Sequence, residues 1–431
     1  MSSVVRRTID RQIAAVAIPA ALALATDPLY DLCDTAILGH IGTAQLAGAA
    51  LATRILAFGY AAFVFLMFGT TAAVARHHGA GREREAAEQG VGAMWLAAGC
   101  GLLAAGIFAV VGRAVIGWFG GTGDVARYAW TYLWVSLGGL PAFTMVMAGV
   151  GFLRGGQDTR RPLAVSAVTV TLNLVLEVLF VYGAGLGVGA SALGTVIAKW
   201  VGAAAYLTLL GRSVRRHGAS WRPKPATIRG QLVVGRDLVV RTVVLLGVFS
   251  VAQAGAARVG VDELAAYAIA FQLWMIGAYA VDGIEAAGQS LIAHRIGAGR
   301  TDELRAVIGR LVRWALALGC IVGAILAATS ALSPHLFTND TNVVAAASAS
   351  LLWVAAMQPV GSLAFALDGV LVGAGRQRYL AGAMVAAGAA FALTTVGAGR
   401  RDLAAIWVAV TTFMVVRALT GVWGVRRLTP T

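Results

Sequence analysis

Three aspartates within one apolar stretch are the residues of this sequence best placed to do chemistry. Asp27, Asp31 and Asp34 are spaced i, i+4, i+7, which puts their side chains on one face of a helix. The stretch is long and apolar enough to cross a membrane, where an ionised carboxylate is costly unless it faces a protein interior or a water-filled cavity. Acids placed in this way serve as proton relays in pumps and transporters. The pattern predicts an ion-coupling site inside the first membrane-spanning helix.

Two prolines lie in the same predicted helix. Pro28 removes one backbone donor and leaves a carbonyl group free at the depth of the aspartates. Pro19 lies upstream, where a proline can kink the helix. The helix that carries the acids is therefore also expected to bend.

The composition is that of a membrane protein. Of the 431 residues, 59% are hydrophobic and 13% are charged, whereas soluble domains carry about 25% charged residues. The net charge of +14 would favour nucleic-acid binding in a soluble protein. Here the arginines lie mostly in alternate loops between apolar runs, so no nucleic-acid partner is expected. The 3 cysteines and 6 histidines show no metal-ligand spacing, so neither a metal site nor a cofactor is expected.

The apolar runs define the predicted membrane topology. Runs of about 20 residues are long enough to span a bilayer as helices. Twelve such spans are predicted, near residues 13–39, 45–75, 87–112, 125–153, 162–183, 189–211, 232–257, 264–292, 304–331, 343–373, 379–397 and 402–425. The basic residues concentrate in the loops that lie on the cytoplasmic side if both termini are cytoplasmic, which agrees with the positive-inside rule. We expect a multi-pass protein of the plasma (inner) membrane.

An internal repeat divides the chain into two halves. Residues 75–82 resemble residues 293–300. The same difference in residue number pairs Pro141 with Pro359 and Gly151 with Gly369. We call this constant difference the repeat offset. The sequence thus predicts an N-terminal six-helix lobe (1–211), a basic cytoplasmic linker (212–230) and a C-terminal six-helix lobe (231–431). Six spans per half insert both halves the same way up. Parallel repeats of this kind place a substrate cavity between the halves and work by alternating access.

Short motifs, in order, carry a resemblance to a known family. The stretches 34–42, 151–160 and 173–177 resemble the first span, the loop after the fourth span and the fifth span of the multidrug and toxic compound extrusion (MATE) family. Gly235-Arg236-Asp237 and Tyr279-Ala280-Val281-Asp282-Gly283 resemble its DinF-like branch. The resemblance implies an all-α protein of twelve transmembrane helices around a central cavity. It also implies an antiporter that exports amphipathic, often cationic, organic compounds in exchange for protons or sodium ions.

The same resemblance assigns residue roles. It implies that Asp34, Asn173, Glu177 and Thr195 form the coupling site. One position departs from the family pattern, because the fifth-span acid is more usually aspartate and is Glu177 here. The longer side chain keeps proton chemistry but changes the coordination distances that a sodium ion needs. This favours protons as the coupling ion, with sodium as the alternative.

Other intramembrane acids leave two interpretations open. Asp27 and Asp31 either join the coupling site or only line the cavity. In the second half, Asp282, Glu285 and Asp368 form either a second substrate or proton site or neutral pairs with the cations of that half, for example Arg241 with Asp282. Arg417 is a further cation of the second half, and Arg54 and Lys199 are those of the first.

Two alternative functions fit the sequence less well. A flippase for a lipid-linked precursor is expected to line its cavity with several arginines, whereas acids outnumber bases in the first-half spans. An enzyme is not expected, since the sequence has neither a His-Glu metal motif nor a Gly-x-Ser-x-Gly elbow. The expected partners are small organic substrates and membrane lipid, and the protein is expected to work as a monomer.

Overall fold

The computed structural model describes residues 3–39, 42–183, 187–397 and 402–428, all as helices, turns and short connections. Within the first helix, the side chains of residues 3–5, 27–36, 38 and 39 lie outside the described part. The chain packs as two units, an N-terminal unit of residues 22–235 and a C-terminal unit of residues 1–21 and 236–431. Two long helices run through both units, α1 (Ser3–Gly39) and α9 (Pro225–Val259).

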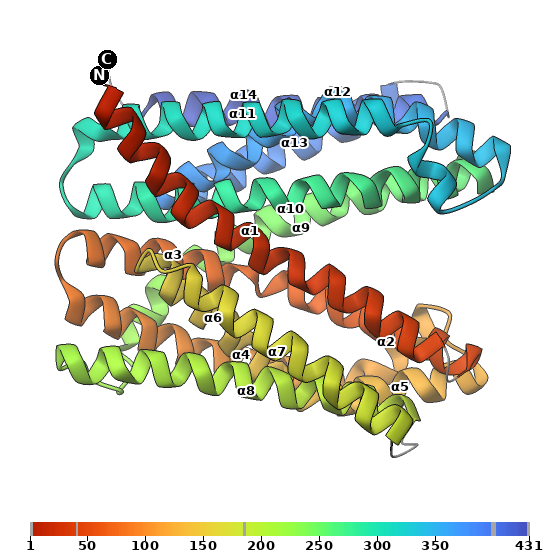
Figure 1. Cartoon of the computed structure of the whole chain (residues 1–431), viewed down its shortest axis with the longest axis horizontal. Helices are drawn as coiled ribbons and strands as arrows, with labels where there is room; N and C mark the ends of the chain where they lie inside the picture. Colours follow the sequence, from red (N-terminus) through yellow and green to blue (C-terminus); the bar gives the residue numbers. More distant parts are fainter. Residues whose placement is uncertain (1–2, 40–41, 184–186, 398–401, 429–431) are drawn as a thin grey trace. The chain divides into compact units, whose positions relative to one another are not determined.

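The N-terminal unit is a bundle in which α6 packs against α3, α4 and α8 (Figure 1). Its further elements are α2 (Thr43–Ala62), α3 (Val64–Gly79), α4 (Glu83–Trp118), α5 (Gly123–Leu137), α6 (Leu140–Gly155), α7 (Arg160–Val178), a π-helical turn η1 (Leu179–Gly183) and α8 (Gly187–His217). Its core is made largely of alanine, leucine and valine side chains. Small side chains allow close approach of helices that gain little from hydrophobic burial in lipid.

The C-terminal unit is built around α12, which packs against α10, α11 and α14. Its elements are α10 (Val261–Gly297), a 3₁₀ turn η2 (Thr301–Glu303), α11 (Leu304–Thr329), a 3₁₀ turn η3 (Ser333–Leu336), α12 (Thr341–Gly373), α13 (Gln377–Gly397) and α14 (Leu403–Arg426). Aromatic side chains, among them Phe249, Tyr267, Trp274, Trp407 and Phe413, fill its core.

The predicted all-helical membrane fold is confirmed. Among the described residues, 10 helices are long and apolar enough to cross a membrane, or 11 if α5 and α6 are counted as one bent span. The remaining predicted span, 232–257, lies within α9, a helix of 35 residues. Each predicted span therefore coincides with a helix or with two consecutive helices.

The internal repeat is visible in the helix boundaries. The pair α2–α3 extends from residue 43 to 79 and α10 from 261 to 297, while the pair α5–α6 extends from 123 to 155 and α12 from 341 to 373. The first half is broken where the second half continues as one helix, since α5 and α6 meet at 53° whereas α12 is uninterrupted. The bend lies at Gly138-Gly139, and the equivalent positions in α12 are Ala356 and Met357. Glycine lacks the Cβ atom that restricts the backbone, so it permits the break.

Equivalent glycines make equivalent contacts in the two halves. A Cβ atom on Gly101 of α4 would lie 2.5 Å from the Cα atom of Pro141, and one on Gly319 of α11 would lie 2.8 Å from that of Pro359. The repeat offset relates both members of each pair. A glycine therefore sets how closely α4 approaches α6 and α11 approaches α12.

Gly101→Ala is expected to lower the thermal unfolding midpoint of the purified protein. The added methyl group overlaps backbone atoms of α6, and overpacking of this kind costs about 1–3 kcal/mol. Gly99→Ala in the same helix is the matched control, because a Cβ atom there meets nothing within 4 Å. Equal midpoints for the two variants would show that the close contact does not limit packing.

Two segments near the predicted lobe boundaries make contacts that the sequence does not predict. Residues 1–21 pack with the C-terminal unit, where Asp10 accepts hydrogen bonds from Arg310 and Trp314 of α11. The predicted linker is tied to α4, since Trp95 Nε1 donates to the carbonyl oxygen of Trp221 at 3.0 Å and Lys224 forms an ion pair with Glu88. The sequence does not reveal these contacts, because the packing partners of both segments are far away in the chain.

Candidate functional site

The three described members of the predicted coupling site lie at the contact between α7 and α8. Asn173 and Glu177 are one turn apart on α7, and both are buried, with Glu177 fully inaccessible to solvent. Asn173 Nδ2 donates to Thr195 Oγ1 of α8 at 3.2 Å. The structure thus brings Asn173 and Thr195 together and puts a carboxyl group one turn away on the same helix.

Local sequence explains why these two helices come so close. A Cβ atom on Gly194 of α8 would lie 3.3 Å from Asn173 Oδ1 and 3.5 Å from the backbone nitrogen of Glu177. The missing side chain at Gly194 makes room for the polar pair. The π-helical turn η1 begins at Leu179, shortly after Glu177, and such wide turns are frequent at functional sites.

The side chains of Asp27, Asp31 and Asp34 lie outside the described residues, so their roles stay predictions. Contacts on either side of this segment show where its helix runs. Thr26 Oγ1 and Ser166 Oγ of α7 are 2.6 Å apart, and the hydroxyl group of Tyr182 in η1 donates to the carbonyl oxygen of Ile37 at 3.3 Å. Thr26 of α1 therefore contacts α7, the helix that carries Asn173 and Glu177, and Ile37 contacts η1, which follows α7. Pro19 lies within α1, which is helical throughout.

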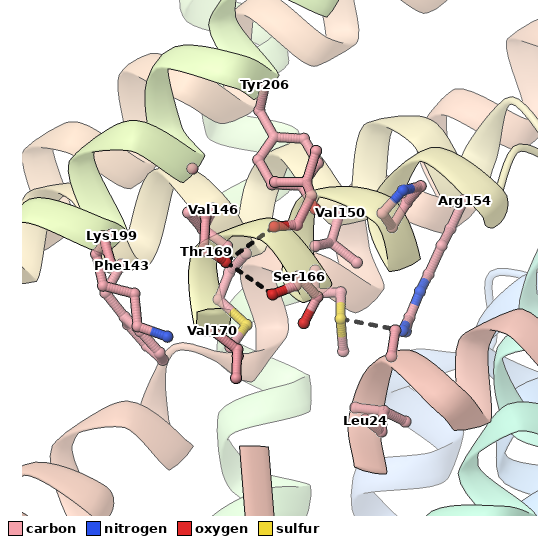
Figure 2. A pocket seen from close by; sticks show the side chains of 17 residues that line it. Leu24, Phe143, Val146, Val150, Arg154, Ser166, Thr169, Val170, Lys199 and Tyr206 are labelled. Carbon is pink, nitrogen blue, oxygen red and sulfur yellow. Dashed lines mark hydrogen bonds between the residues drawn. The ribbon is translucent and has the colours of Figure 1, made fainter. Parts of the chain in front are cut away.

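A cavity of about 100 Å³ lies within the N-terminal unit (Figure 2). Side chains of α1, α3, α6, α7 and α8 line it. Most of the lining is apolar, and its polar members are Arg154, Ser166, Thr169, Lys199 and Tyr206. Figure 2 shows Lys199 beside Phe143 at one side of the cavity and Arg154 at the other. The cavity therefore combines an apolar wall with two cations and several hydroxyl groups.

Arg154 is an interior residue, although the sequence predicts a position in a cytoplasmic loop. It lies in α6 with 3% of its surface exposed. Its Nη1 atom lies 3.3 Å from Met67 Sδ of α3. The motif Gly151-Phe152-Leu153-Arg154 contains a signal for this, because an apolar run reaches the arginine without a turn residue after Gly151.

The C-terminal unit holds a buried cluster of charges, which we call the charge cluster: Arg241, Glu285, Asp368 and Arg417. Asp368 Oδ2 accepts from Arg241 Nη2 at 2.9 Å and from Arg417 Nη2 at 2.7 Å. Arg241 Nη2 also donates to Glu285 Oε1 at 3.2 Å. Each of the four residues is at most 4% exposed. Two cations and two acids neutralise one another, which is the arrangement that makes buried charges tolerable.

These contacts show the ion-pair partners of two acids that the sequence singled out in the second half. Glu285 and Asp368, predicted as acids of the second half, are both ion-pair partners of Arg241. Asp282, one turn before Glu285 on α10, is half-buried and close enough for its charge to act on Arg241. Gln289 Nε2 adds a hydrogen bond to Glu285 Oε1 at 3.3 Å. Glu285 and Asp368 are therefore paired with cations, and a role of these acids in a second substrate or proton site stays a prediction.

No group of three or more histidine, cysteine or acidic side chains that could hold a metal ion occurs among the described residues. The side chains of residues 27–36 are outside that statement. The polar groups that the structure does describe are a buried carboxyl group, an amide and a hydroxyl group between α7 and α8, and two cations in the cavity. Such groups can bind and release a proton and can bind an organic molecule.

Comparison with known proteins places this architecture in a family. One family model, described as MatE, matches residues 19–179 and again residues 239–398. Protein DETOXIFICATION 44, chloroplastic, of Arabidopsis thaliana is 31% identical over 430 residues, which cover 96% of this chain and 82% of that protein. DNA damage-inducible protein F of Escherichia coli (strain K12) is 28% identical over 415 residues, which cover 95% of this chain and 90% of that protein.

A solved structure shares the fold over almost the whole chain. It is described as the outward-facing conformation of a multidrug resistance MATE family transporter of the MOP superfamily, with a TM-score of 0.86 and 19% sequence identity. The alignment covers 97% of this chain and 96% of that structure. The two matches to one family model fall in the two halves of the repeat and cover most of the sequence. This protein therefore belongs to the MatE family of membrane transporters.

Proposed function

We propose that this transporter exports amphipathic organic compounds across the plasma membrane in exchange for protons. The observation that carries the proposal is Glu177, a fully buried carboxyl group one turn from the hydrogen-bonded pair Asn173–Thr195. A carboxyl group buried at membrane depth is costly to keep ionised, and such groups mark proton pathways. The name of one relative contains the word detoxification, and the description of one similar structure mentions multidrug resistance. Both support organic compounds as the transported substrates.

Protons fit the described site better than sodium ions. A sodium site needs several oxygen ligands held at fixed distances, whereas a proton site needs one carboxyl group that can be neutral or charged. The amide of Asn173 donates to Thr195, so the hydroxyl oxygen of Thr195 is already an acceptor. Glutamate has a longer side chain than the aspartate that is more usual at the position of Glu177. Binding of a proton does not depend on that length. The sodium-coupled version of the same exporter is the alternative.

The proposed cycle couples protonation to the shape of α1. The boundary between the two packing units falls between residues 21 and 22 of α1, close to Pro19. A proline removes one hydrogen bond of the helix, so bending there costs less than elsewhere. In the proposal, protons from outside reach Asp34 and its neighbours, α1 bends near Pro19, and the substrate leaves. Loss of the protons to the cytoplasm resets the site, and both termini lie on that side.

The experiment is transport by the purified protein in proteoliposomes. A fluorescent organic cation is supplied and a pH gradient is imposed without sodium, for wild type and for Asp34→Asn, after both have passed the same folding check. Transport by wild type and none by Asp34→Asn supports the proposal. Transport that starts only when sodium is added overturns the proton assignment. Failure of both ions with every tested cation favours the lipid-precursor flippase instead.

A further inference from the structure

The repeat offset relates the charge cluster of the C-terminal unit to the cavity of the N-terminal unit. It pairs Arg241 with Ala23, Glu285 with Met67, Asp368 with Val150 and Arg417 with Lys199. All four of these N-terminal residues line the cavity. The charge cluster and the cavity therefore involve equivalent positions of the two repeats. Ion pairs occupy these positions in the C-terminal unit, and a cavity lies at them in the N-terminal unit.

Lys199 is the one charge of the cluster that the N-terminal copy retains. Its equivalent, Arg417, donates to the carboxylate of Asp368 at 2.7 Å. In the N-terminal copy, the repeat offset puts Val150 at the position of Asp368. The Nζ atom of Lys199 lies 5.6 Å from the centre of the Phe143 ring. None of the described carboxylates forms an ion pair with this half-buried ammonium group, and the side chains of Asp27, Asp31 and Asp34 lie outside the described residues.

The other polar groups of the cavity are already engaged. Thr169 Oγ1 donates to the carbonyl oxygens of Val165 and Ser166 at 2.9 and 3.1 Å (Figure 2). Ser166 Oγ is 2.6 Å from Thr26 Oγ1. Arg154 is held at the opposite side of the cavity against Met67. Within the described lining, Lys199 is thus the charged donor best able to accept a new partner.

We propose that this cavity binds the carboxylate end of an amphipathic organic ligand, with the ligand carboxylate beside Lys199 as Asp368 is beside Arg417. The proposal rests on the proposed function in one respect, namely that the ligand is cargo. A cavity of about 100 Å³ has room for a carboxylate and a few attached carbons, while drug-sized ligands fill about 300–1,000 Å³. The apolar remainder of the ligand therefore extends out of the cavity. One ammonium group balances the single charge of one carboxylate, and a charge-assisted hydrogen bond stabilises the pair.

Three dyes with the same fluorophore and different charge test this inference. Dansylglycine carries a carboxylate, dansylglycinamide is its neutral amide, and dansylcadaverine carries an ammonium group. Each is titrated against the protein in nanodiscs of neutral lipid. Wild type is expected to bind dansylglycine at least about tenfold more tightly than the amide, because hydrogen bonds to charged groups are worth about 1.5–3 kcal/mol.

Variants at two repeat-related positions separate carboxylate recognition from general effects. Lys199→Gln is expected to abolish the preference for dansylglycine, and Lys199→Arg to keep it. Val150→Asp restores the acid that the other half has, and it is expected to weaken dansylglycine binding while dansylcadaverine binding persists. Arg54→Gln is the matched control, since it removes one cation of an N-terminal-unit helix that does not line the cavity. This control is expected to behave as wild type.

The outcomes distinguish this inference from the proposed function. Equal affinity of wild type for the acid and the amide, or no binding of any dye, overturns the inference. An equal change for all three dyes in Lys199→Gln also overturns it, because the residue then has only a structural role. If dansylcadaverine is transported by a pH gradient but dansylglycine is not preferred, the proposed function stands and the inference fails. If dansylglycine is preferred but no dye is transported, the inference stands as a binding site and proton-coupled export fails.

Discussion

Glu177→Gln is expected to reduce pH-driven transport to the level of empty liposomes, with the protein still folded. Glutamine has nearly the shape of glutamic acid and keeps polar atoms next to the Asn173–Thr195 pair, but it cannot release a proton. Glutamine fills nearly the same buried space on α7, so the variant removes the group that can release a proton and keeps the packing. The measurement is the initial rate of dye transport in proteoliposomes under an imposed pH gradient.

Two further variants make this result specific. Glu177→Asp keeps a carboxyl group at the position and is expected to retain measurable proton-driven transport. Asp124→Asn removes an acid whose side chain is 70% exposed and paired with Arg127, so wild-type rates are expected. Wild-type rates in Glu177→Gln would show that the proton is carried elsewhere. Asp34 would then be the remaining acid of the predicted site.

Asp368→Val is expected to lower the free energy of unfolding by about 3–5 kcal/mol, the usual cost of removing one partner from a buried ion pair. Asp368 Oδ2 accepts hydrogen bonds from both Arg241 and Arg417. Valine leaves Arg417, which is 2% exposed, beside the sulfur atom of Met414 and two aromatic rings. The measurement is the unfolding midpoint of the purified protein, read in the same detergent for each variant.

The repeat supplies the matched control for Asp368→Val. A quadruple variant, Arg241→Ala, Glu285→Met, Asp368→Val and Arg417→Leu, replaces all four charges of the cluster. At the first three positions it introduces the residues that line the N-terminal cavity. Because both cations and both acids are removed together, it is expected to be more stable than the single Asp368→Val variant. Replacing a whole buried ion network is often near neutral, whereas breaking it is not. A quadruple variant less stable than the single one would contradict the view that the cluster is held by mutual neutralisation.

The two halves show how one repeat is used in two ways. The C-terminal copy keeps both cations and both acids, which bond to one another and fill the space between α9, α10, α12 and α14. The N-terminal copy replaces three of the four with alanine, methionine and valine, and a cavity results. These three differences distinguish the charge cluster of one half from the candidate binding cavity of the other.

Much of the fold could be predicted from the sequence because the membrane leaves few choices. Backbone groups in lipid must bond within their own segment, so apolar runs of sufficient length become helices. The repeat offset is readable at positions such as Gly151 and Pro141, where close helix contacts allow little variation. Sequence also marks Asn173 and Glu177 as one helix face, since their spacing determines it.

The sequence by itself determined the helices, the repeat and the residues whose side chains could bind ions or protons. Tertiary structure alone decided which of them meet. The hydrogen bond between Asn173 and Thr195 depends on the close approach of α7 and α8 that Gly194 permits. The partners of Arg241 include Asp368, which lies on α12, far from Arg241 in the sequence. The cavity beside Lys199 exists because Ala23, Met67 and Val150 converge from three helices. Helical periodicity orients a side chain around its own axis, but only the packing of helices against each other determines what it faces.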